Sequence, residues 1–262
     1  MIPHVIVRSA LTPLMAQPTL RAEQVSQIVL GETAAVLERA GEWRRVRLAS
    51  DGYEGWTHRG FSEEVGEQEA EQWQTQAIGW SMGAVVRVGG HLVRLPLRAR
   101  LALKDGGVQL PDGRMGEVVE GSVPDSATVV AAARAKAPER WAMEHFAGAP
   151  YQWGGVTPWG VDCSGLVQTT FSARGLQLPR DSAAQVSCGT PVPLDAARPG
   201  DLLFFQGEES RNITHVAFAG EGDTLVHSTV ACGGVLVEPW LSGTRTASLR
   251  ERLVSVRRLE GR

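Results

Sequence analysis

This 262-residue chain has only three cysteines, no long apolar run and no large excess of one charge, and each of these features excludes a class of protein. Three cysteines cannot close a disulfide framework, and their spacing lacks the paired Cys-x-x-Cys of a zinc site. No stretch approaches the roughly 18 apolar residues that a membrane-spanning helix needs. The formal net charge of −3 gives no field that would attract nucleic acid or a membrane surface. We therefore expect no metal, no cofactor, no nucleic-acid partner and no membrane partner.

The beginning of the chain has no recognisable targeting segment. Residues 1–8 read Met-Ile-Pro-His-Val-Ile-Val-Arg and lack the basic start and apolar run of a signal peptide. We therefore expect a cytoplasmic protein; a secreted or periplasmic location would follow if the sequence is truncated. The length fits about two domains, and 43% apolar with 21% charged residues are ordinary values for a soluble globular protein.

The first 66 residues predict a small β module. Proline and glycine divide them into short β-type segments with the spacing of a small barrel or sandwich. The expected strands are Val25–Leu30, Ala35–Glu38, Trp43–Leu48 and Gly55–His58. With the Gly-Trp elements of residues 41–46 and 51–56, this order resembles the bacterial SH3-like domains that are attached to cell-wall enzymes.

A second, divergent β module is expected over residues 79–125. Within it, residues 95–103 alternate between apolar and other side chains, the period of a strand with one buried face. The acidic stretch 62–78 before it indicates a short helix or a linker, and the Ala-rich residues 126–137 indicate a link to the second half. This module resembles the first one only weakly.

The second half, residues 138–262, begins with helical sequence. Pro138 suits a first helical position, apolar side chains recur at helical spacing as far as Phe146, and Gly148 is a suitable stop. His145 lies on this stripe. We expect it to be packed or exposed rather than catalytic.

Cys163 is the candidate nucleophile. It follows a glycine-rich turn and Asp162, a residue type that caps helices, and it begins a segment with the apolar period of a helix. The N-terminal end of a helix favours a thiolate, and its free N–H groups can stabilise an oxyanion on an attacked carbonyl. The alternative is a small buried hydrophobe, which is our reading of Cys188 and Cys232.

Two histidines follow in strand-like sequence on either side of the turn at residues 220–222. If Gly222 ends a three-residue hairpin loop, the register pairs His215 with His227. Their Cβ atoms would then lie about 4.5–5.5 Å apart on one face, whereas a loop one residue shorter or longer would separate them. A single histidine in a strand is more often structural, but two in register favour catalysis. We expect His215 to take the proton of Cys163 and His227 to orient His215.

Five motifs of the second half occur in a characteristic order. They are Pro150-Tyr-Gln-Trp-Gly-Gly155, Asp162-Cys-Ser-Gly-Leu166, Pro179-Arg-Asp-Ser182, Arg198-Pro-Gly-Asp-Leu202 and Thr214-His-Val216. This order resembles the NlpC-type cell-wall cysteine peptidases, which are compact papain-like enzymes, over about residues 138–262. The resemblance implies Cys163 as nucleophile, His215 as base and His227 as third polar residue. Tyr151 falls where a residue helps the oxyanion hole; the alternative is a core aromatic.

The expected fold class is a multidomain α+β protein, in which small all-β SH3-like barrel modules precede a papain-like α+β catalytic domain. Members with such modules resemble γ-D-glutamyl-L-diamino acid peptidases, which act on small muropeptides with a free N-terminal L-alanine. The resemblance implies that Asp162, Ser164 and Ser182 bind the amino end of the substrate, and that Glu23 and Tyr53 close one end of the groove. The alternatives are a helix cap for Asp162, solvated surface for Glu23 and barrel packing for Tyr53.

The leading functional hypothesis is a cysteine endopeptidase that recycles peptidoglycan-derived peptides by cutting the bond between γ-D-glutamate and the diamino acid. In this reading the first module is a gate that selects substrates with a free L-alanine. The same Cys-His pair would also serve an amidase or an acyltransferase, because fold and nucleophile do not fix the acyl donor. A non-catalytic module that binds wall peptides is the third alternative, and an intact Cys163, His215 and His227 argue against it.

Overall fold

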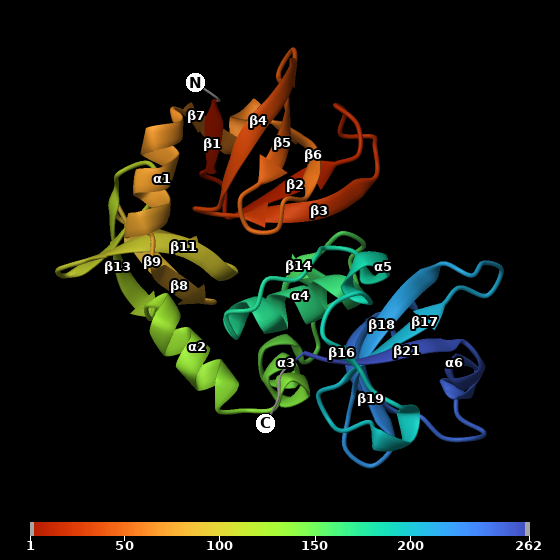
Figure 1. The fold of residues 1–262 in the computed structure, drawn as a ribbon. Helices are drawn as coiled ribbons and strands as arrows, with labels where there is room; N and C mark the ends of the chain where they lie inside the picture. Colours follow the sequence, from red (N-terminus) through yellow and green to blue (C-terminus); the bar gives the residue numbers. More distant parts are fainter. Residues whose placement is uncertain (1–2, 260–262) are drawn as a thin grey trace. The chain divides into compact units, whose positions relative to one another are not determined.

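The protein consists of two compact units, residues 1–130 and 131–262, in a computed structural model that describes residues 3–259 (Figure 1). No helix among the described residues is long and apolar enough to cross a membrane. The first unit is almost entirely β structure, and the second combines helices with one sheet.

The first module is a sheet of short antiparallel strands. These are β1 (His4–Val7), β2 (Leu11–Met15), β3 (Gln24–Val29), β4 (Thr33–Ala40), β5 (Trp43–Leu48), β6 (Glu54–His58) and β7 (Ser62–Val65), in the order β3-β2-β6-β5-β4-β1-β7. The four predicted strands are confirmed as β3 to β6, and side chains such as Val46 and Leu48 alternate into one apolar core. The sequence does not predict β1 and β2, because Pro3 and Pro13 read as breaks.

A short helix, α1 (Glu67–Gln76), precedes the second module, which is a second antiparallel sheet. The strands of this sheet are β8 (Gly79–Met82), β9 (Val85–Val88), β10 (His91–Arg94), β11 (Leu97–Lys104), β12 (Gly107–Gln109) and β13 (Met115–Glu120). The sheet order is β10-β9-β13-β12-β11-β8. The acidic stretch therefore contains a helix, and the alternating residues 95–103 fall mainly on β11, an inner strand.

The two β modules form one unit, because the turn after β3 belongs to the core of the second sheet. Leu30 packs in that core, and its carbonyl accepts a hydrogen bond of 2.8 Å from the N–H of Arg100. Gly31 has φ +82°, and a Cβ there would lie 2.1 Å from the carbonyl oxygen of Arg100, so only glycine fits. The indole of Trp73 in α1 donates to the carbonyl of Gly31 at 2.8 Å, and the buried Arg98 pairs with Glu32 at 2.6 Å.

The second unit is a six-stranded antiparallel sheet with helices. Its elements are α3 (Pro138–Phe146), β14 (Val156–Thr157), β15 (Gly160–Val161), α4 (Cys163–Ala173), α5 (Ser182–Gln185), β16 (Thr190–Pro191), β17 (Leu202–Gln206), β18 (Ile213–Ala219), β19 (Thr224–Thr229), β20 (Gly234–Pro239), α6 (Ala247–Glu251) and β21 (Leu253–Arg258). The sheet order is β16-β21-β17-β18-β19-β20, and β14 pairs with β15 separately. The expected helix from Pro138 is confirmed as α3. Most of the expected link, residues 126–134, is helix α2 (Ser126–Arg134).

Both faces of this sheet are covered. Helices α3 and α4, green in Figure 1, contact the blue strands β18 and β19, and the rings of Phe171 in α4 and Phe218 in β18 lie 6.0 Å apart. Side chains that point to the other face of the sheet, such as Phe205, form a second core with Leu249 of α6. His145 of α3 lies against Trp141, with ring centroids 4.3 Å apart, so it is packed as expected.

Candidate active site

Cys163 is the first residue of α4, and the preceding turn is arranged around Asp162. Asp162 is the N-cap: its Oδ1 accepts a hydrogen bond of 2.7 Å from the N–H of Gly165. The helix-cap reading of Asp162 is therefore confirmed. Cys163 is 8% exposed, so the thiol sits at a largely desolvated helix start.

A buried ion pair holds this turn together. Arg180, 2% exposed, donates to both carboxylate oxygens of Asp162, at 2.6 and 3.0 Å, and to the hydroxyl of Ser164 at 2.8 Å. Asp162 also accepts from the hydroxyl of Ser164 at 3.1 Å and from the N–H of Gly154 at 2.8 Å. Because five donors surround its carboxylate, Asp162 first of all fixes the glycine-rich turn onto the helix start. A role for Asp162 and Ser164 toward substrate stays a prediction.

The hairpin that carries the histidines has a register two residues away from the predicted one. Phe218 pairs with Val226, and Ala219 pairs with Leu225. The three-residue loop therefore covers residues 221–223 instead of 220–222, because Asp223, with φ 55°, shares the left-handed region with Gly222. The expected direct pairing of the histidines is wrong, but a shift of two residues keeps both on the same face.

The two imidazoles meet diagonally across β18 and β19. Nε2 of His215 lies 2.9 Å from Nδ1 of His227, and Nε2 of His227 lies 2.9 Å from a carboxylate oxygen of Glu238 on β20. A carboxylate only accepts hydrogen bonds, so His227 carries its proton on Nε2 and accepts on Nδ1. His215 then donates from Nε2, which leaves its Nδ1 without a proton. That nitrogen is the base that a cysteine nucleophile requires.

Cys163 approaches β18 beside the first histidine. The thiol interacts with two backbone N–H groups as hydrogen-bond donors: that of Val216, the residue after His215, and that of Ser164. Strands β18 and β19 pair only near Phe218 and Ala219, so the His215 end of β18 is outside that ladder. The contact with Val216 places the thiol next to the residue that follows His215.

Burial decides the charge state of the two reacting groups. It raises the pKa of Cys163 to about 12, against the smaller opposite effect of the N–H groups of Val216 and Ser164. Burial also lowers the pKa of His215 to about 3, assisted by its neighbour His227. Burial therefore opposes the thiolate that the helix start favours, and it favours the neutral imidazole of His215.

Folding stability should fall in acid because the fold favours the neutral form of both histidines, of which His227 is buried and His215 is partly buried. Burial lowers the pKa of His215 to about 3 and also lowers that of His227, so the unfolded chain binds their protons first. Stability is complete above pH 6.5 and is lost as pH falls from there toward 3. Urea unfolding between pH 7 and 4 should show His215→Gln losing less stability than the wild type, by up to about 1.4 kcal/mol per pH unit. The control His91→Gln, an exposed site, should keep the wild-type slope; an identical slope in both variants would contradict the assignment.

Tyr151 lies close to the thiol. An isolated bridge aligns it with Val161, and its pKa is raised by burial and then by the neighbouring Cys163. Its place beside the nucleophile agrees with the predicted position at the oxyanion hole, and its role stays a prediction. Ser182 is buried at the start of α5.

The remaining substrate-binding candidates from the sequence, Glu23 and Tyr53, belong to the first unit. Glu23 is exposed in the first unit, and Tyr53 packs partly against the core of the first sheet. Their substrate roles stay predictions. Cys232 is exposed, so its reading as a buried hydrophobe is wrong, and Cys188 is partly exposed. Within residues 3–259 no group of three or more His, Cys, Asp or Glu side chains is placed to hold a metal ion.

Sequence reasoning missed two residues of this site. Arg180 stands inside the motif 179–182, and a carboxylate expected at a buried helix start could have indicated a cationic partner. Glu238 is the one charged side chain in the otherwise apolar run 234–239, which is the signal that could have singled it out.

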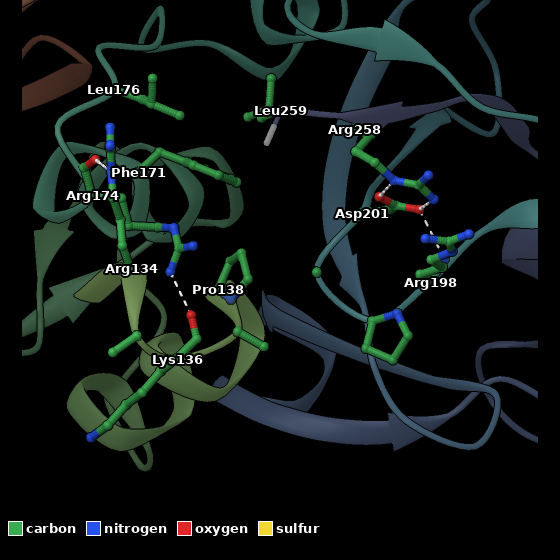
Figure 2. A pocket seen from close by; sticks show the side chains of 14 residues that line it. Arg134, Lys136, Pro138, Phe171, Arg174, Leu176, Arg198, Asp201, Arg258 and Leu259 are labelled. Carbon is green, nitrogen blue, oxygen red and sulfur yellow. Dashed lines mark hydrogen bonds and ion pairs between the residues drawn. The ribbon is translucent and has the colours of Figure 1, made fainter. Parts of the chain in front are cut away.

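A hollow of about 700 Å³ lies at the other end of α4 from Cys163 (Figure 2). It is lined among others by Phe171, Arg174, Leu176, Pro199, Asp201 and Arg258. Figure 2 shows that these charges are engaged: Arg258 reaches Asp201 at 2.7 and 2.8 Å, and Arg174 donates to the carbonyl of Lys136 at 2.7 Å. A rise of about 1.5 Å per residue puts the length of α4 between this hollow and the thiol, so it is separate from the candidate active site.

Comparison with known sequences identifies both halves of the chain. The NlpC/P60 family matches residues 148–258, and the bacterial dipeptidyl-peptidase SH3 domain matches residues 14–59. A protein of Bacillus subtilis named gamma-D-glutamyl-L-lysine dipeptidyl-peptidase is 45% identical over 84 residues, which are 32% of this chain and 28% of that protein. The probable endopeptidase NlpC of Escherichia coli is 37% identical over 110 residues, 42% of this chain and 68% of that protein.

Comparison with solved structures agrees on the fold. An NlpC/P60 family protein from Bacillus cereus matches with a TM-score of 0.74 at 19% identity, over 98% of this chain and 99% of the other. The expected fold class, an all-β SH3-like region followed by a papain-like α+β domain, is thereby confirmed. With a cysteine at a helix start, two linked histidines and a matching family relative, the chain belongs to the NlpC/P60 family.

Proposed function

We propose that the protein is a cysteine endopeptidase that hydrolyses the γ-D-glutamyl–diamino acid bond of peptidoglycan stem peptides. The observation that carries this proposal is the line from His215 through His227 to Glu238, joined by two contacts of 2.9 Å. It leaves an unprotonated Nδ1 on His215, whose neighbour Val216 contacts the thiol of Cys163 through its N–H.

Acylation begins with proton transfer and attack. As Sγ of Cys163 bonds to the carbonyl carbon of γ-D-glutamate, its proton passes to Nδ1 of His215. The carbonyl oxygen becomes an oxyanion, which the backbone N–H of Cys163 at the start of α4 and the hydroxyl of Tyr151 receive. His215 then gives the proton to the amine of the diamino acid. The C–N bond breaks, and a thioester on Cys163 remains.

Deacylation repeats these steps with water. Nδ1 of His215 takes a proton from water, whose oxygen attacks the thioester carbonyl. When the C–S bond breaks, the proton returns to Sγ of Cys163 and the γ-carboxylate product leaves. Because burial favours the neutral thiol and the neutral imidazole, each attack is proposed to be assisted by His215 as a general base.

The substrate is proposed to be a small muropeptide with a free N-terminal L-alanine, as in the recycling of wall peptides. The Bacillus subtilis relative carries the name gamma-D-glutamyl-L-lysine dipeptidyl-peptidase, and the SH3 domain matched in this chain is of the bacterial dipeptidyl-peptidase type. A recognition site for an ammonium group needs carboxylates and hydroxyls. Ser164, Ser182, Glu23 and Tyr53 are the side chains proposed to provide these groups together with Asp162.

If the first module is a gate, Glu23→Gln should raise KM for a peptide with a free L-alanine amine and leave KM for its N-acetylated form unchanged. An exposed charge contact contributes at most about 1 kcal/mol, so KM should rise by up to about fivefold. Glu38→Gln, on an exposed carboxylate of β4, is the matched control. Deleting residues 1–66 is a poorer test, because Leu30 and Gly31 belong to the core of the second sheet. If KM is the same for both peptides in the wild type and in the variant, the first module does not select for a free amine, and the gate hypothesis is wrong.

The direct test of the proposed function is incubation with L-Ala-γ-D-Glu joined to lysine or to diaminopimelate, followed by mass spectrometry. We expect the dipeptide L-Ala-γ-D-Glu and the free diamino acid. A product in which the dipeptide is joined to an added amine would favour the acyltransferase. Cleavage only of a side-chain or C-terminal amide would favour the amidase, and binding without turnover would favour a non-catalytic module.

A further inference from the structure

We propose that Glu238 is a positioning residue of the active site, which fixes the tautomer of His227 and through it presents the unprotonated Nδ1 of His215 to Cys163. This inference rests on the proposed function only in assigning His215 as the base. Glu238 itself lies two hydrogen bonds away from the reacting nitrogen.

The sheet explains how three side chains from three strands line up. Phe218 pairs with Val226, so His215 lies one diagonal step from His227 across β18 and β19. On the other side, His227 is opposite Leu236, so Glu238 is again two residues along. Diagonal neighbours are about 7–8 Å apart at Cα, within reach of long side chains. The same parity on adjacent strands therefore produces one line of hydrogen bonds.

The hydrogen bonds from His215 through His227 to Glu238 all have the same donor-to-acceptor direction, because the carboxylate of Glu238 can only accept. Glu238 is buried, its Oε2 lies 2.9 Å from Nε2 of His227, and that imidazole is 1% exposed. If His227 carried its proton on Nδ1 instead, a bare nitrogen would face the carboxylate. His215 would then accept at Nε2 and carry its proton on Nδ1, where it could not act as base.

Arg245 keeps this acceptor ionised. It pairs with Glu238 through two hydrogen bonds, one from Nε at 3.0 Å. Burial by itself would raise the pKa of Glu238, but the hydrogen bonds from Arg245 and His227 outweigh it and hold that pKa below its ordinary value. Two other charged or titratable groups lie near this line of hydrogen bonds. The charge of Arg252 lowers the pKa of His215, and Cys232 lies beside Arg245.

The test uses two variants in one background, Arg245→Met, so that no second donor competes for the acceptor. Glu238→Gln in this background retains an amide oxygen that His227 can reach, whereas Glu238→Met has no acceptor. Relative to Arg245→Met alone, we expect kcat to fall about 10–100-fold for the Met variant, the size of one lost buried hydrogen bond, and within about fivefold for the Gln variant. KM should change little in either, because Glu238 does not touch substrate. Equal loss in both, or a loss that appears mainly in KM, would overturn the proposal.

A second measurement decides the proposal without substrate and without a variant. Long-range ¹H–¹⁵N spectra of the full chain at pH 7.5 distinguish protonated from bare imidazole nitrogens. We expect His215 and His227 both to carry the proton on Nε2. A proton on Nδ1 of His215 in the free enzyme would overturn the proposal even if the variants fail to fold. If the wild type does not cleave the peptide, the proposed function fails, while these spectra still decide the role of Glu238.

Discussion

Replacing Cys163 by alanine is expected to abolish peptide cleavage, with kcat lower by about 10⁴-fold or more. Nucleophile variants of hydrolases that act through a covalent intermediate lose activity on this scale. Alanine fits in place of Cys163, because it is smaller than the cysteine, which is 8% exposed. The free energy of unfolding should therefore change by about 1 kcal/mol or less. Steady-state assays with the tripeptide and urea unfolding of the same preparation measure both quantities.

The matched control is Cys188→Ala. Cys188 is a partly exposed cysteine in the segment after α5, so this variant should keep both activity and stability. Residual cleavage at more than a hundredth of the wild-type rate in Cys163→Ala would contradict covalent catalysis by this residue. Loss of activity in both variants would point to a structural cause.

Replacing Arg180 by methionine should lower the free energy of unfolding by about 3–5 kcal/mol, because it leaves the charge of Asp162 buried without its partner. Both side chains are nearly inaccessible, at 1% and 7% exposure, and Asp162 also caps α4, the helix that begins at Cys163. Activity should fall together with stability, since the turn before Cys163 is no longer held. Chemical denaturation at pH 7 measures the first effect, and tripeptide cleavage measures the second.

Two further variants test whether the loss of stability in Arg180→Met comes from the buried, unpaired charge of Asp162 or from the loss of an ion pair as such. Arg140→Met removes an ion pair whose side chains are 65% and 67% exposed, and this change should affect stability by at most about 0.5 kcal/mol. The double variant Asp162→Asn with Arg180→Met no longer buries a lone charge and should recover part of the lost stability. A double variant with the sum of both single losses would contradict the account.

The sequence predicts where the candidate residues Cys163, His215 and His227 lie in the fold, because their signals are local or depend only on parity. A cysteine after a capping residue and a glycine-rich turn marks a helix start, and α4 begins at Cys163. The parity of a three-residue loop puts His215 and His227 on one face wherever the loop begins. The register itself is off by two, because Asp223 takes the left-handed conformation that we assigned to the last loop residue, Gly222.

The partners that support these residues come from contacts that no local pattern encodes. Glu238 reaches His227 only because β20 pairs beside β19 in a given register, and Arg180 reaches Asp162 from the segment after α4. The union of the two β modules depends on Gly31 and its close approach to Arg100. The charge state of Cys163 also depends on tertiary burial, which outweighs the local effect of the helix start.

Trapping the acyl-enzyme tests the central claim, that Cys163 attacks the γ-D-glutamyl carbonyl, most directly. The full chain is mixed with L-Ala-γ-D-Glu-diaminopimelate, quenched in acid within one turnover and digested for peptide mass spectrometry. The account predicts an adduct with the mass of the L-Ala-γ-D-Glu acyl group on the peptide that contains Cys163, and no adduct in Cys163→Ala. An adduct on Cys188 or Cys232, or cleavage of the substrate by Cys163→Ala, would contradict it.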